Sequence, residues 1–302
     1  MPAYEIAHEL MARPLPNRGG WLVLCPSHGD RHPSLSIRDG ENGRLLVKCF
    51  SGCDSREILK TLADMGLLDG SPVSRPVPEP EPKDDTEKRI KRAGALWSES
   101  APITPGDPVW LYLRGRGIVL SEWPEDLRCH PGLDYWTVGD TGKPMRTGVF
   151  PCLLAVVRSP TGRPVAIHRT YLTENGSKAP VDPAKKNYGV HPMQGGTVRL
   201  FSPRDGVLAV AEGIEDALSA WVLWQIPTWA CLGTSGLRSF DPPEGVKELL
   251  IFSDRDENGA GQKAARELAK KLKKKMAVSV RLPGGHAKDI NQLLQKGALH
   301  AV

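Results

Sequence analysis

Acidic side chains follow two apolar segments of the chain, each at the point where the apolar run ends. The segments are "VLAVAEGIEDALSAW" (207–221) and "ELLIFSDRDENGAG" (248–261). Carboxylates gathered at one place repel each other, and such an arrangement persists most easily around a bound cation. The sequence therefore predicts one cation site built from two strand ends. The acids that follow the two runs are Glu212, Glu215 and Asp216 in the first segment and Asp254 and Asp256 in the second.

The chemistry of this site depends on whether the two strands are neighbours. In an open parallel sheet, ligands bind beyond the carboxyl ends of the strands, so neighbouring strands would bring Glu212, Asp254 and Asp256 together. Hard oxygen ligands with open coordination positions suit Mg²⁺ or Mn²⁺ holding phosphates. Two such ions about 4 Å apart could activate a 3′-hydroxyl and stabilise leaving pyrophosphate. In the alternative interpretation, Asp254 and Asp256 are ordinary loop and helix-cap residues.

Two further acids have two possible roles. Asp216 lies one turn beyond Glu212 and could face the same site. Asp289, in "HAKDINQLL" (286–294), precedes a predicted helix. It is either a plain N-cap or a fourth acid at the carboxyl edge of the sheet.

A second group of residues has the spacing of a zinc site. "CPSH" contributes one thiolate and one imidazole, and "CFSGC" contributes two thiolates. These ligands suit tetrahedral Zn²⁺, and a small sheet without a sizeable core would gain folding energy from the metal. The alternative is three unrelated thiols and a surface histidine. The predicted zinc ligands are Cys25, His28, Cys49 and Cys53.

Basic and aromatic residues are interspersed between residues 163 and 188. Cations beside aromatic rings suit single-stranded nucleic acid, because phosphates pair with the cations and bases stack on the rings. The alternative is a solvated basic face. The residues concerned are Arg163, His168, Arg169, Tyr171, Lys178, Lys185, Lys186 and Tyr188.

The bulk composition is that of an ordinary soluble protein of 302 residues. The net charge of +5 and the pI of about 8.9 permit a nucleic-acid partner. No run of 18 apolar residues exists, so neither a membrane-spanning helix nor a membrane partner is expected. No secretory signal is visible, and six cysteines are too few for a disulfide scaffold, so a cytoplasmic location is expected.

Alternating apolar and amphipathic segments indicate the elements that position the acids. Residues 149–172 indicate a β-hairpin, and strands and helices alternate from residue 207 onward. Such alternation is typical of a parallel sheet with covering helices. The predicted strands of this sheet are 207–211, 228–232, 248–253 and 277–282.

The acidic segments "AEGIEDALSA", "IFSDRDENGAG" and "KDINQLL" resemble the three motifs of the Toprim domain. That domain is shared by bacterial-type primases, type IA and II topoisomerases and certain nucleases. "CPSHGDRHPSLSI…VKCFSGC" resembles the amino-terminal zinc-binding domain of bacterial-type and phage primases, and residues 149–189 are similar to the small basic subdomain that precedes Toprim there. The resemblance is closest to the short Toprim primases of phages, plasmids and integrated elements.

The resemblance implies an α/β fold of three parts. An amino-terminal zinc-ribbon domain precedes a small β-rich basic subdomain and a Toprim domain with a Rossmann-like parallel sheet. The expected boundaries are 1–68 for the zinc-binding domain, 69–92 for a proline-rich linker, 93–200 for the basic subdomain and 201–302 for Toprim.

The resemblance also implies roles for individual residues. Glu212, Asp254 and Asp256 would bind Mg²⁺ or Mn²⁺, with Asp216 and Asp289 as supporting acids. Arg169, Lys178 and Lys185 or Lys186, beside His168, would line the groove for template and nucleotide. Two departures from the family pattern are present: three residues separate Cys49 from Cys53 instead of two, and position 291, where a second acid is frequent, is Asn.

The implied function is that of a DNA primase, which makes short RNA primers on single-stranded DNA from nucleoside triphosphates. Because the sequence has no GxxxxGK[ST] phosphate loop, a separate replicative helicase or initiator is the expected partner. The alternatives are a Toprim nuclease, which would cleave without nucleotides, and a non-catalytic DNA-binding adaptor. An adaptor would be expected to lack the motif acids, which are present here.

Overall fold

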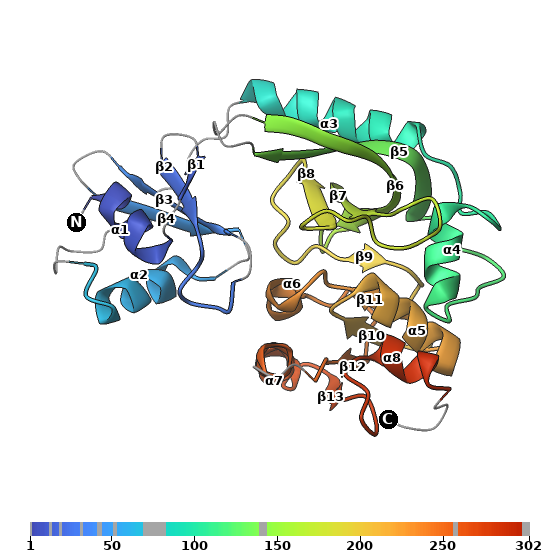
Figure 1. Cartoon of the computed structure of the whole chain (residues 1–302). Coiled ribbons are helices and arrows are strands. Elements are labelled where there is room, and N and C mark those ends of the chain that lie inside the picture. Colours follow the sequence, from blue (N-terminus) through green and yellow to red (C-terminus); the bar gives the residue numbers. More distant parts are fainter. Residues whose placement is uncertain are drawn as a thin grey trace. The chain divides into compact units, whose positions relative to one another are not determined.

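The computed structural model describes the chain except for residues 1, 12–13, 18–19, 31–32, 41–43, 51–52, 69–82, 139–143, 256–258 and 298–302. The chain divides into two compact units (Figure 1). One unit comprises residues 1–81 with 136–145, and the other comprises 82–135 with 146–302. Within the described residues, no helix combines the length and apolar character needed to cross a membrane.

The first unit is built on a four-stranded antiparallel sheet in the order β1-β2-β3-β4. Asp54 caps the second helix, because its side chain accepts a hydrogen bond from the Arg56 backbone N–H at 2.8 Å. Ile58 and Leu62 of that helix pack into the small core of the unit. The elements are α1 (Ala3–Leu10), β1 (Leu15–Asn17), β2 (Gly20–Val23), β3 (Leu35–Asp39), β4 (Leu45–Cys49) and α2 (Ser55–Asp64).

The second unit begins with two helices and a four-stranded sheet in the order β5-β6-β7-β8. Helix α3 packs on one face of this sheet through Leu96 and Trp97 (Figure 1). The helix begins at Lys83, so residues 83–92 are helical where the sequence predicted part of a linker. The elements are α3 (Lys83–Ser98), α4 (Pro108–Gly115), β5 (Leu127–Val138), β6 (Pro144–Arg158), β7 (Pro164–Tyr171) and β8 (Lys185–Gly189).

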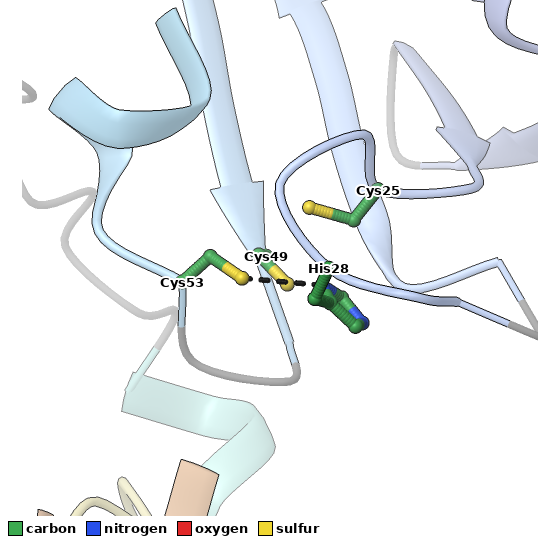
Figure 2. A group of neighbouring side chains, drawn as sticks. All are labelled: Cys25, His28, Cys49 and Cys53. Carbon is green, nitrogen blue, oxygen red and sulfur yellow. Dashed lines mark hydrogen bonds between the residues drawn. The ribbon is translucent and has the colours of Figure 1, made fainter. Parts of the chain in front are cut away.

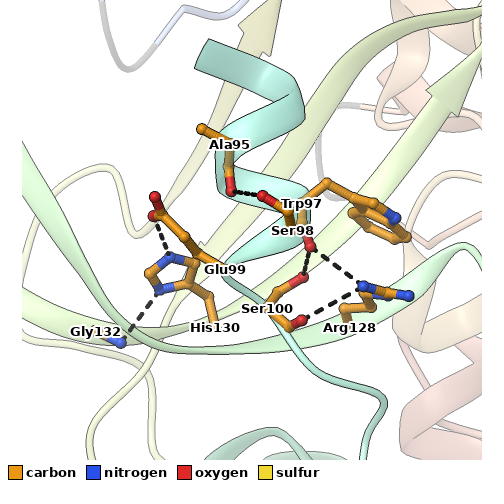
Figure 3. A network of polar contacts seen from close by, with 8 residues as sticks. All are labelled: Ala95, Trp97, Ser98, Glu99, Ser100, Arg128, His130 and Gly132. Carbon is orange, nitrogen blue, oxygen red and sulfur yellow. Dashed lines mark hydrogen bonds and ion pairs between the residues drawn. The ribbon is translucent and has the colours of Figure 1, made fainter. Parts of the chain in front are cut away.

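A polar network attaches the end of α3 to β5 (Figure 3). Arg128 Nη1 donates to the backbone carbonyl of Trp97 at 3.2 Å, and its guanidinium lies 4.8 Å from the Trp97 ring centroid. The ring of buried His130 lies 3.6 Å from Glu99 and accepts a hydrogen bond from the Gly132 N–H at 3.2 Å. These contacts satisfy carbonyls at the helix end, and they fix the helix on the sheet.

The rest of the second unit is a five-stranded sheet in the order β13-β12-β10-β11-β9. All its pairs are parallel except β11 with β9, which confirms the predicted parallel sheet. Helices α5 and α8 pack on one face, and α6 and α7 pack on the other (Figure 1). The elements are β9 (Val198–Arg199), β10 (Val207–Ala211), α5 (Ile214–Trp224), β11 (Thr228–Ala230), α6 (Thr234–Ser239), β12 (Glu248–Phe252), α7 (Ala260–Leu272), β13 (Ala277–Arg281) and α8 (Ile290–Gln295).

Strand β10 explains why its sequence is an unbroken apolar run. Leu208 and Val210 are buried in the core beneath α6 and α7, and Ala209 and Ala211 are buried in the core beneath α5. A strand covered on both faces has no solvent side on which polar residues could alternate. The first acid after the run, Glu212, therefore marks the edge of the sheet.

Candidate metal centre and active site

The four predicted zinc ligands come together in the first unit (Figure 2). One ligand atom from each of Cys25, His28, Cys49 and Cys53 lies within 4.8 Å of the other three, and His28 Nδ1 lies 3.1 Å from Cys53 Sγ. Tetrahedral zinc with Zn–S bonds of about 2.3 Å holds two sulfurs about 3.8 Å apart, so the group fits this ion. Among the described His, Cys, Asp and Glu side chains, no other group of three or more gathers its ligand atoms this closely.

Asp30 orients the first pair of ligands and was not identified from the sequence. Its Oδ2 accepts hydrogen bonds from the Cys25 N–H at 2.9 Å and from Ser34 Oγ at 2.6 Å. Its Oδ1 lies 3.4 Å from His28 Nε2. This contact leaves Nδ1 of His28 directed toward the sulfurs. Carboxylates commonly orient metal-binding histidines in this way.

The thiols of Cys25 and Cys53 hold their protons until a metal displaces them. Burial and the nearby charge of Cys49 raise the pKa of Cys53 to about 11. A hydrogen bond with Cys49 and burial raise the pKa of Cys25 above its usual range. Zinc binding to this group would therefore release protons and become stronger as pH rises.

The predicted acidic site lies at one edge of the parallel sheet. Strands β10 and β12 are neighbours, with Val210 opposite Ile251, so both carboxyl ends reach the same edge. Asp254 is brought toward the segment before α8, because the Arg255 N–H donates to the Lys288 carbonyl at 2.7 Å. Asp256 lies outside the described residues, so its placement remains a prediction.

A cavity of about 490 Å³ lies at this edge and contains groups of both charges. Its acids come from the Toprim-like segments, and its cations come from the end of α4, from the segment between β7 and β8, and from β8. Gly213 lies where a Cβ would come within 3.0 Å of Asp216 Oδ2, so a larger residue would crowd the acids. The charged lining residues are Glu212, Glu215, Asp216, Asp254, Asp289, Arg116, Lys178 and Lys185.

The acids are close enough to perturb one another. Burial, together with the charges of Asp254 and Asp289, raises the pKa of Asp216 to about 8. A divalent cation would relieve this repulsion, and carboxylate oxygens are the ligands that Mg²⁺ and Mn²⁺ prefer. Glu212, Asp216 and Asp254 therefore fit such an ion, which needs only one or two direct carboxylates because it keeps several waters.

Asp289 shows both of the roles that the sequence left open. Its Oδ1 accepts a hydrogen bond from the Gln292 N–H at 2.6 Å, so it caps α8. Its side chain also lines the cavity, and its charge acts on Asp216. Capping and a contribution to the acidic wall are therefore compatible.

The structure separates the five predicted nucleic-acid contacts into two sets. His168, Lys178 and Lys185 line the cavity. Arg169 and Lys186 are opposite each other on β7 and β8, one residue on from His168 and Lys185. Because side chains alternate along a strand, they point to the other face of the sheet. There Lys186 Nζ lies 3.6 Å from the Tyr135 ring centroid, and burial and Arg169 lower the pKa of Lys186 to about 8.

His168 is a neutral residue of the cavity wall. It is 6% exposed, and its Nδ1 lies 2.7 Å from Asn187 Oδ1. Burial lowers its pKa to about 4, a direction that nearby Lys185 reinforces and the Asn187 contact opposes. At neutral pH this ring therefore offers a hydrogen bond rather than a charge.

Glu215 is an important residue that the sequence did not identify as part of the site. Its Oε1 accepts a hydrogen bond from the Tyr112 hydroxyl at 2.6 Å, and Lys185 Nζ lies 2.8 Å from Oε1 and 2.9 Å from Oε2. Burial alone would raise its pKa, but the charge and hydrogen bonds of Lys185 and the Tyr112 hydrogen bond hold the pKa well below its usual range. The available signal was an acid among the apolar residues Ile214, Ala217 and Leu218, since a buried carboxylate needs a cationic partner.

The asparagine at position 291 joins three helices. Its backbone N–H donates to Asp216 Oδ1 at 3.0 Å, and its Nδ2 donates to the Arg116 carbonyl at 2.9 Å and to Ser219 Oγ at 3.0 Å. Arg116 Nη1 donates to Asn291 Oδ1 at 2.9 Å. The amide can donate to the Arg116 carbonyl and also accept from the Arg116 guanidinium, because it has both donors and an acceptor. A carboxylate has acceptors alone. Asn291 is thus part of the wall that supports Asp216.

Two family models match the second unit. The model of the Toprim domain matches residues 207–298, and the model of a domain of unknown function, DUF7146, matches residues 87–200. No curated protein was found to match the chain. The domains implied by the sequence resemblance, a Cys/His metal-binding group followed by Toprim, are therefore confirmed.

Several primase structures are similar to parts of the chain. The crystal structure of the Aquifex aeolicus primase (zinc-binding and RNA polymerase domains) has 16% identity and a TM-score of 0.45, covering 99% of this chain and 81% of that one. The RNA polymerase domain of Mycobacterium tuberculosis primase DnaG has 16% identity and a TM-score of 0.44, and the match covers 72% of this chain and 82% of that one. A DNA primase domain from Pseudomonas aeruginosa has 19% identity and a TM-score of 0.37, covering 55% of this chain. The match spans about half, 52%, of the Pseudomonas chain.

Proposed function

We propose that this Toprim-containing chain is a DNA primase, a nucleotidyltransferase that makes short primers on single-stranded DNA. The observation that carries the proposal is the cavity lined both by the acids Glu212, Asp216 and Asp254 and by the cations Arg116 and Lys178. The carboxylates suit a divalent cation, and the cations beside them suit phosphates. Substrates that carry both a metal ion and phosphates, such as nucleoside triphosphates, match this distribution of charge.

The reaction joins the 3′-hydroxyl of one nucleotide to the α-phosphate of the next and releases pyrophosphate. When bound at the acids, Mg²⁺ or Mn²⁺ supplies electrostatic stabilisation for the phosphate oxygens. Glu212, Asp216 and Asp254 would hold the ion, with Asp256 and Asp289 in support. Arg116 and Lys178 would hold and orient the triphosphate, and neutral His168 would contribute a hydrogen bond at the cavity wall.

The remaining parts of the chain receive roles that follow from the family resemblance. The zinc group of the first unit would help to select the template sequence at which synthesis starts. Arg169 and Lys186, on the face away from the cavity, would contact template outside the reaction centre. A separate replicative helicase or initiator of a phage, plasmid or integrated element would bring the protein to DNA. Co-purification with such proteins at low and high salt tests this last role.

Primer synthesis on mixed-sequence single-stranded DNA tests the proposal. The assay contains labelled nucleoside triphosphates and Mg²⁺ or Mn²⁺, with wild type beside Asp254→Asn and Glu212→Gln. Short labelled products are expected from wild type, and each substitution is expected to reduce them at least about 100-fold, since metal contacts contribute several kcal/mol to transition-state stabilisation. Glu267→Gln is the matched control, because Glu267 pairs with Arg238 on the exposed surface of α7.

Other outcomes would move the assignment to the other candidates. Cleavage of DNA without nucleotides, lost in Asp254→Asn, would identify a Toprim nuclease. Binding of single-stranded DNA that is unaffected by Asp254→Asn, with neither synthesis nor cleavage, would identify a DNA-binding adaptor.

A further inference from the structure

The three cations of the cavity have different electrostatic environments. Lys185 forms an ion pair with Glu215 that involves both carboxylate oxygens. Among the described residues, no ion pair joins Arg116 or Lys178 to a carboxylate; Arg116 donates to the neutral amide of Asn291 instead. A cation whose charge is already compensated contributes little to the attraction of a phosphate, whereas an uncompensated one contributes fully.

Glu215 holds Lys185 from a protected position. The Glu215 side chain is 7% exposed, whereas the Lys185 side chain is 37% exposed and borders the cavity. The Tyr112 hydroxyl on α4 donates to the same carboxylate at 2.6 Å and anchors it to that helix. The lysine is therefore within reach of the cavity but is retained at its wall.

The same carboxylate is connected to Arg116. The Arg116 guanidinium lies 4.9 Å from the centroid of the Tyr112 ring, on the residue that donates to Glu215. The guanidinium also donates to Asn291 Oδ1 at 2.9 Å. The segment that carries Lys178 packs closely on the same helix, because a Cβ on Gly176, whose φ is +77°, would lie 2.6 Å from Leu111 and from Tyr112. Within the part of the chain that the structure describes, Arg116 and Lys178 thus share the support of α4 without a carboxylate partner, whereas Lys185 is paired with Glu215.

We infer that Glu215 is a positioning residue that withholds Lys185 from the phosphates of the substrate and leaves Arg116 and Lys178 to bind them. The inference rests on the proposed function, because it assigns the cations of the same site. It differs from the family resemblance, which places Lys185 or Lys186 among the groove-lining contacts.

Loss of the Glu215 charge would release a cation at the cavity wall. The freed lysine would attract phosphates and strengthen nucleotide binding. Because the freed lysine would draw the triphosphate away from its position on Arg116 and Lys178, it would stabilise bound substrate more than the transition state and slow the reaction. Tighter binding with slower turnover is the expected signature, and a purely structural role of Glu215 would not produce it.

Equilibrium binding of a fluorescently labelled ATP, measured with Mg²⁺ by anisotropy, tests the inference without requiring catalysis. Glu215→Gln is expected to lower the Kd of the probe about fivefold, and Lys178→Met to raise it about tenfold, which are the effects of gaining or losing one charge-assisted contact. The double variant Lys185→Met/Glu215→Gln, which keeps the net charge of the cavity, is expected to bind within about twofold of wild type. Glu267→Gln controls for loss of an acid elsewhere and is expected to leave the Kd unchanged.

Two results would overturn the inference. If Lys185 contacts phosphates directly, the double variant will lose affinity to the same extent as Lys178→Met. If Glu215 only stabilises the fold, Glu215→Gln will bind the probe no more tightly than wild type. Should Glu215→Gln not fold, the double variant still decides whether Lys185 contacts the phosphates, because it leaves neither charge buried without its partner.

Steady-state primer synthesis supplies the second measurement. In Glu215→Gln, KM for nucleotide and kcat are both expected to fall, and in the double variant KM is expected to return to the wild-type value. An absence of primers from wild type would contradict the proposed function, while the probe affinities would still decide the role of Glu215. Normal primer synthesis with unchanged KM and kcat in Glu215→Gln would contradict the positioning role alone.

Discussion

The zinc group and the acidic cavity are both candidate metal sites, but they are assembled in opposite ways. The zinc group takes its ligands from residues 25–53, at the ends of strands in one small sheet. The cavity takes its charged groups from positions as distant as Arg116 and Asp289, and it joins two sheets of the second unit. A local site depends on its metal for folding, whereas a site at a sheet edge is supported by the core around it.

The cores of the two units explain this difference. The first unit buries a single small cluster around Ile6, Leu35 and Ile58, and the zinc ligands Cys25 and Cys49 belong to that cluster. The second unit buries three clusters, two of which cover opposite faces of the parallel sheet. Small domains with little core commonly rely on metals, so zinc and folding should be coupled in the first unit alone.

The largest expected effect is that of zinc removal. Chelation, or Cys49→Ser, is expected to unfold the first unit, because structural zinc contributes about 10 kcal/mol or more of binding free energy to such domains. The second unit is expected to remain folded. Limited proteolysis combined with circular dichroism distinguishes the units. If residues 20–68 resist protease after complete zinc loss, the first unit does not depend on its metal for folding, and the two sites do not differ in this respect.

The next effect concerns Asp216, whose pKa is raised to about 8 by burial and by the neighbouring acids. The folded state binds this proton more tightly than the unfolded state does. Without added Mg²⁺ or Mn²⁺, Asp216 therefore does not lower the free energy of unfolding below about pH 4. Above that pH its destabilising effect grows as the pH rises toward 8. Asp216→Asn is expected to stabilise the protein by about 4 kcal/mol at pH 7 and to have little effect at pH 4. Urea unfolding of the second unit at both pH values measures this difference.

A smaller effect of opposite sign is expected for His168, whose pKa burial lowers to about 4. The neutral His168 ring contributes fully to stability above pH 6.5, and this contribution is lost as the pH falls toward 4. The reason is that the imidazole is protonated in the unfolded state at a higher pH than in the folded state. The loss is about 3 kcal/mol. His168→Gln is expected to flatten the dependence of unfolding free energy on pH between 6.5 and 4. An unchanged slope would show that the imidazole is not held neutral in the cavity wall.

The smallest effect is expected for an exposed ion pair remote from both sites. Arg238 Nε lies 2.8 Å from Glu267 Oε2, with both side chains more than one-third exposed. Glu267→Gln is expected to change the unfolding free energy by less than about 0.5 kcal/mol, because exposed ion pairs are screened by solvent. Thermal unfolding beside Asp216→Asn provides the comparison. A change as large as that of Asp216→Asn would indicate a general response to lost charge.

The parallel sheet was predictable from the sequence for a physical reason. Strands such as β10 and β12 are covered on both faces, so their apolar runs are continuous and end sharply at the acids. The zinc ligands were predictable because their spacing is local. The helical start of α3 at Lys83 was missed, because the segment is polar and its stability comes from packing of Leu96 and Trp97 on the sheet.

The partners within the cavity could not be predicted in the same way. The contact of Tyr112 with Glu215 and that of Arg116 with Asn291 join segments more than 100 residues apart, and nothing in the local sequence pairs them. The division of Arg169 from His168 was available from the sequence, because adjacent strand residues point to opposite faces. The predicted group of basic residues therefore contained two surfaces, and only one of them meets the acids.

Binding of Mn²⁺ to the zinc-loaded protein, followed by electron paramagnetic resonance, tests most directly the claim that the cavity is a second, separate metal site. Wild type and Asp254→Asn are titrated side by side, and the zinc content of each is measured. The account predicts saturable Mn²⁺ binding in wild type that Asp254→Asn weakens at least about tenfold, with one zinc retained in both. Equal Mn²⁺ binding in the two proteins would contradict it.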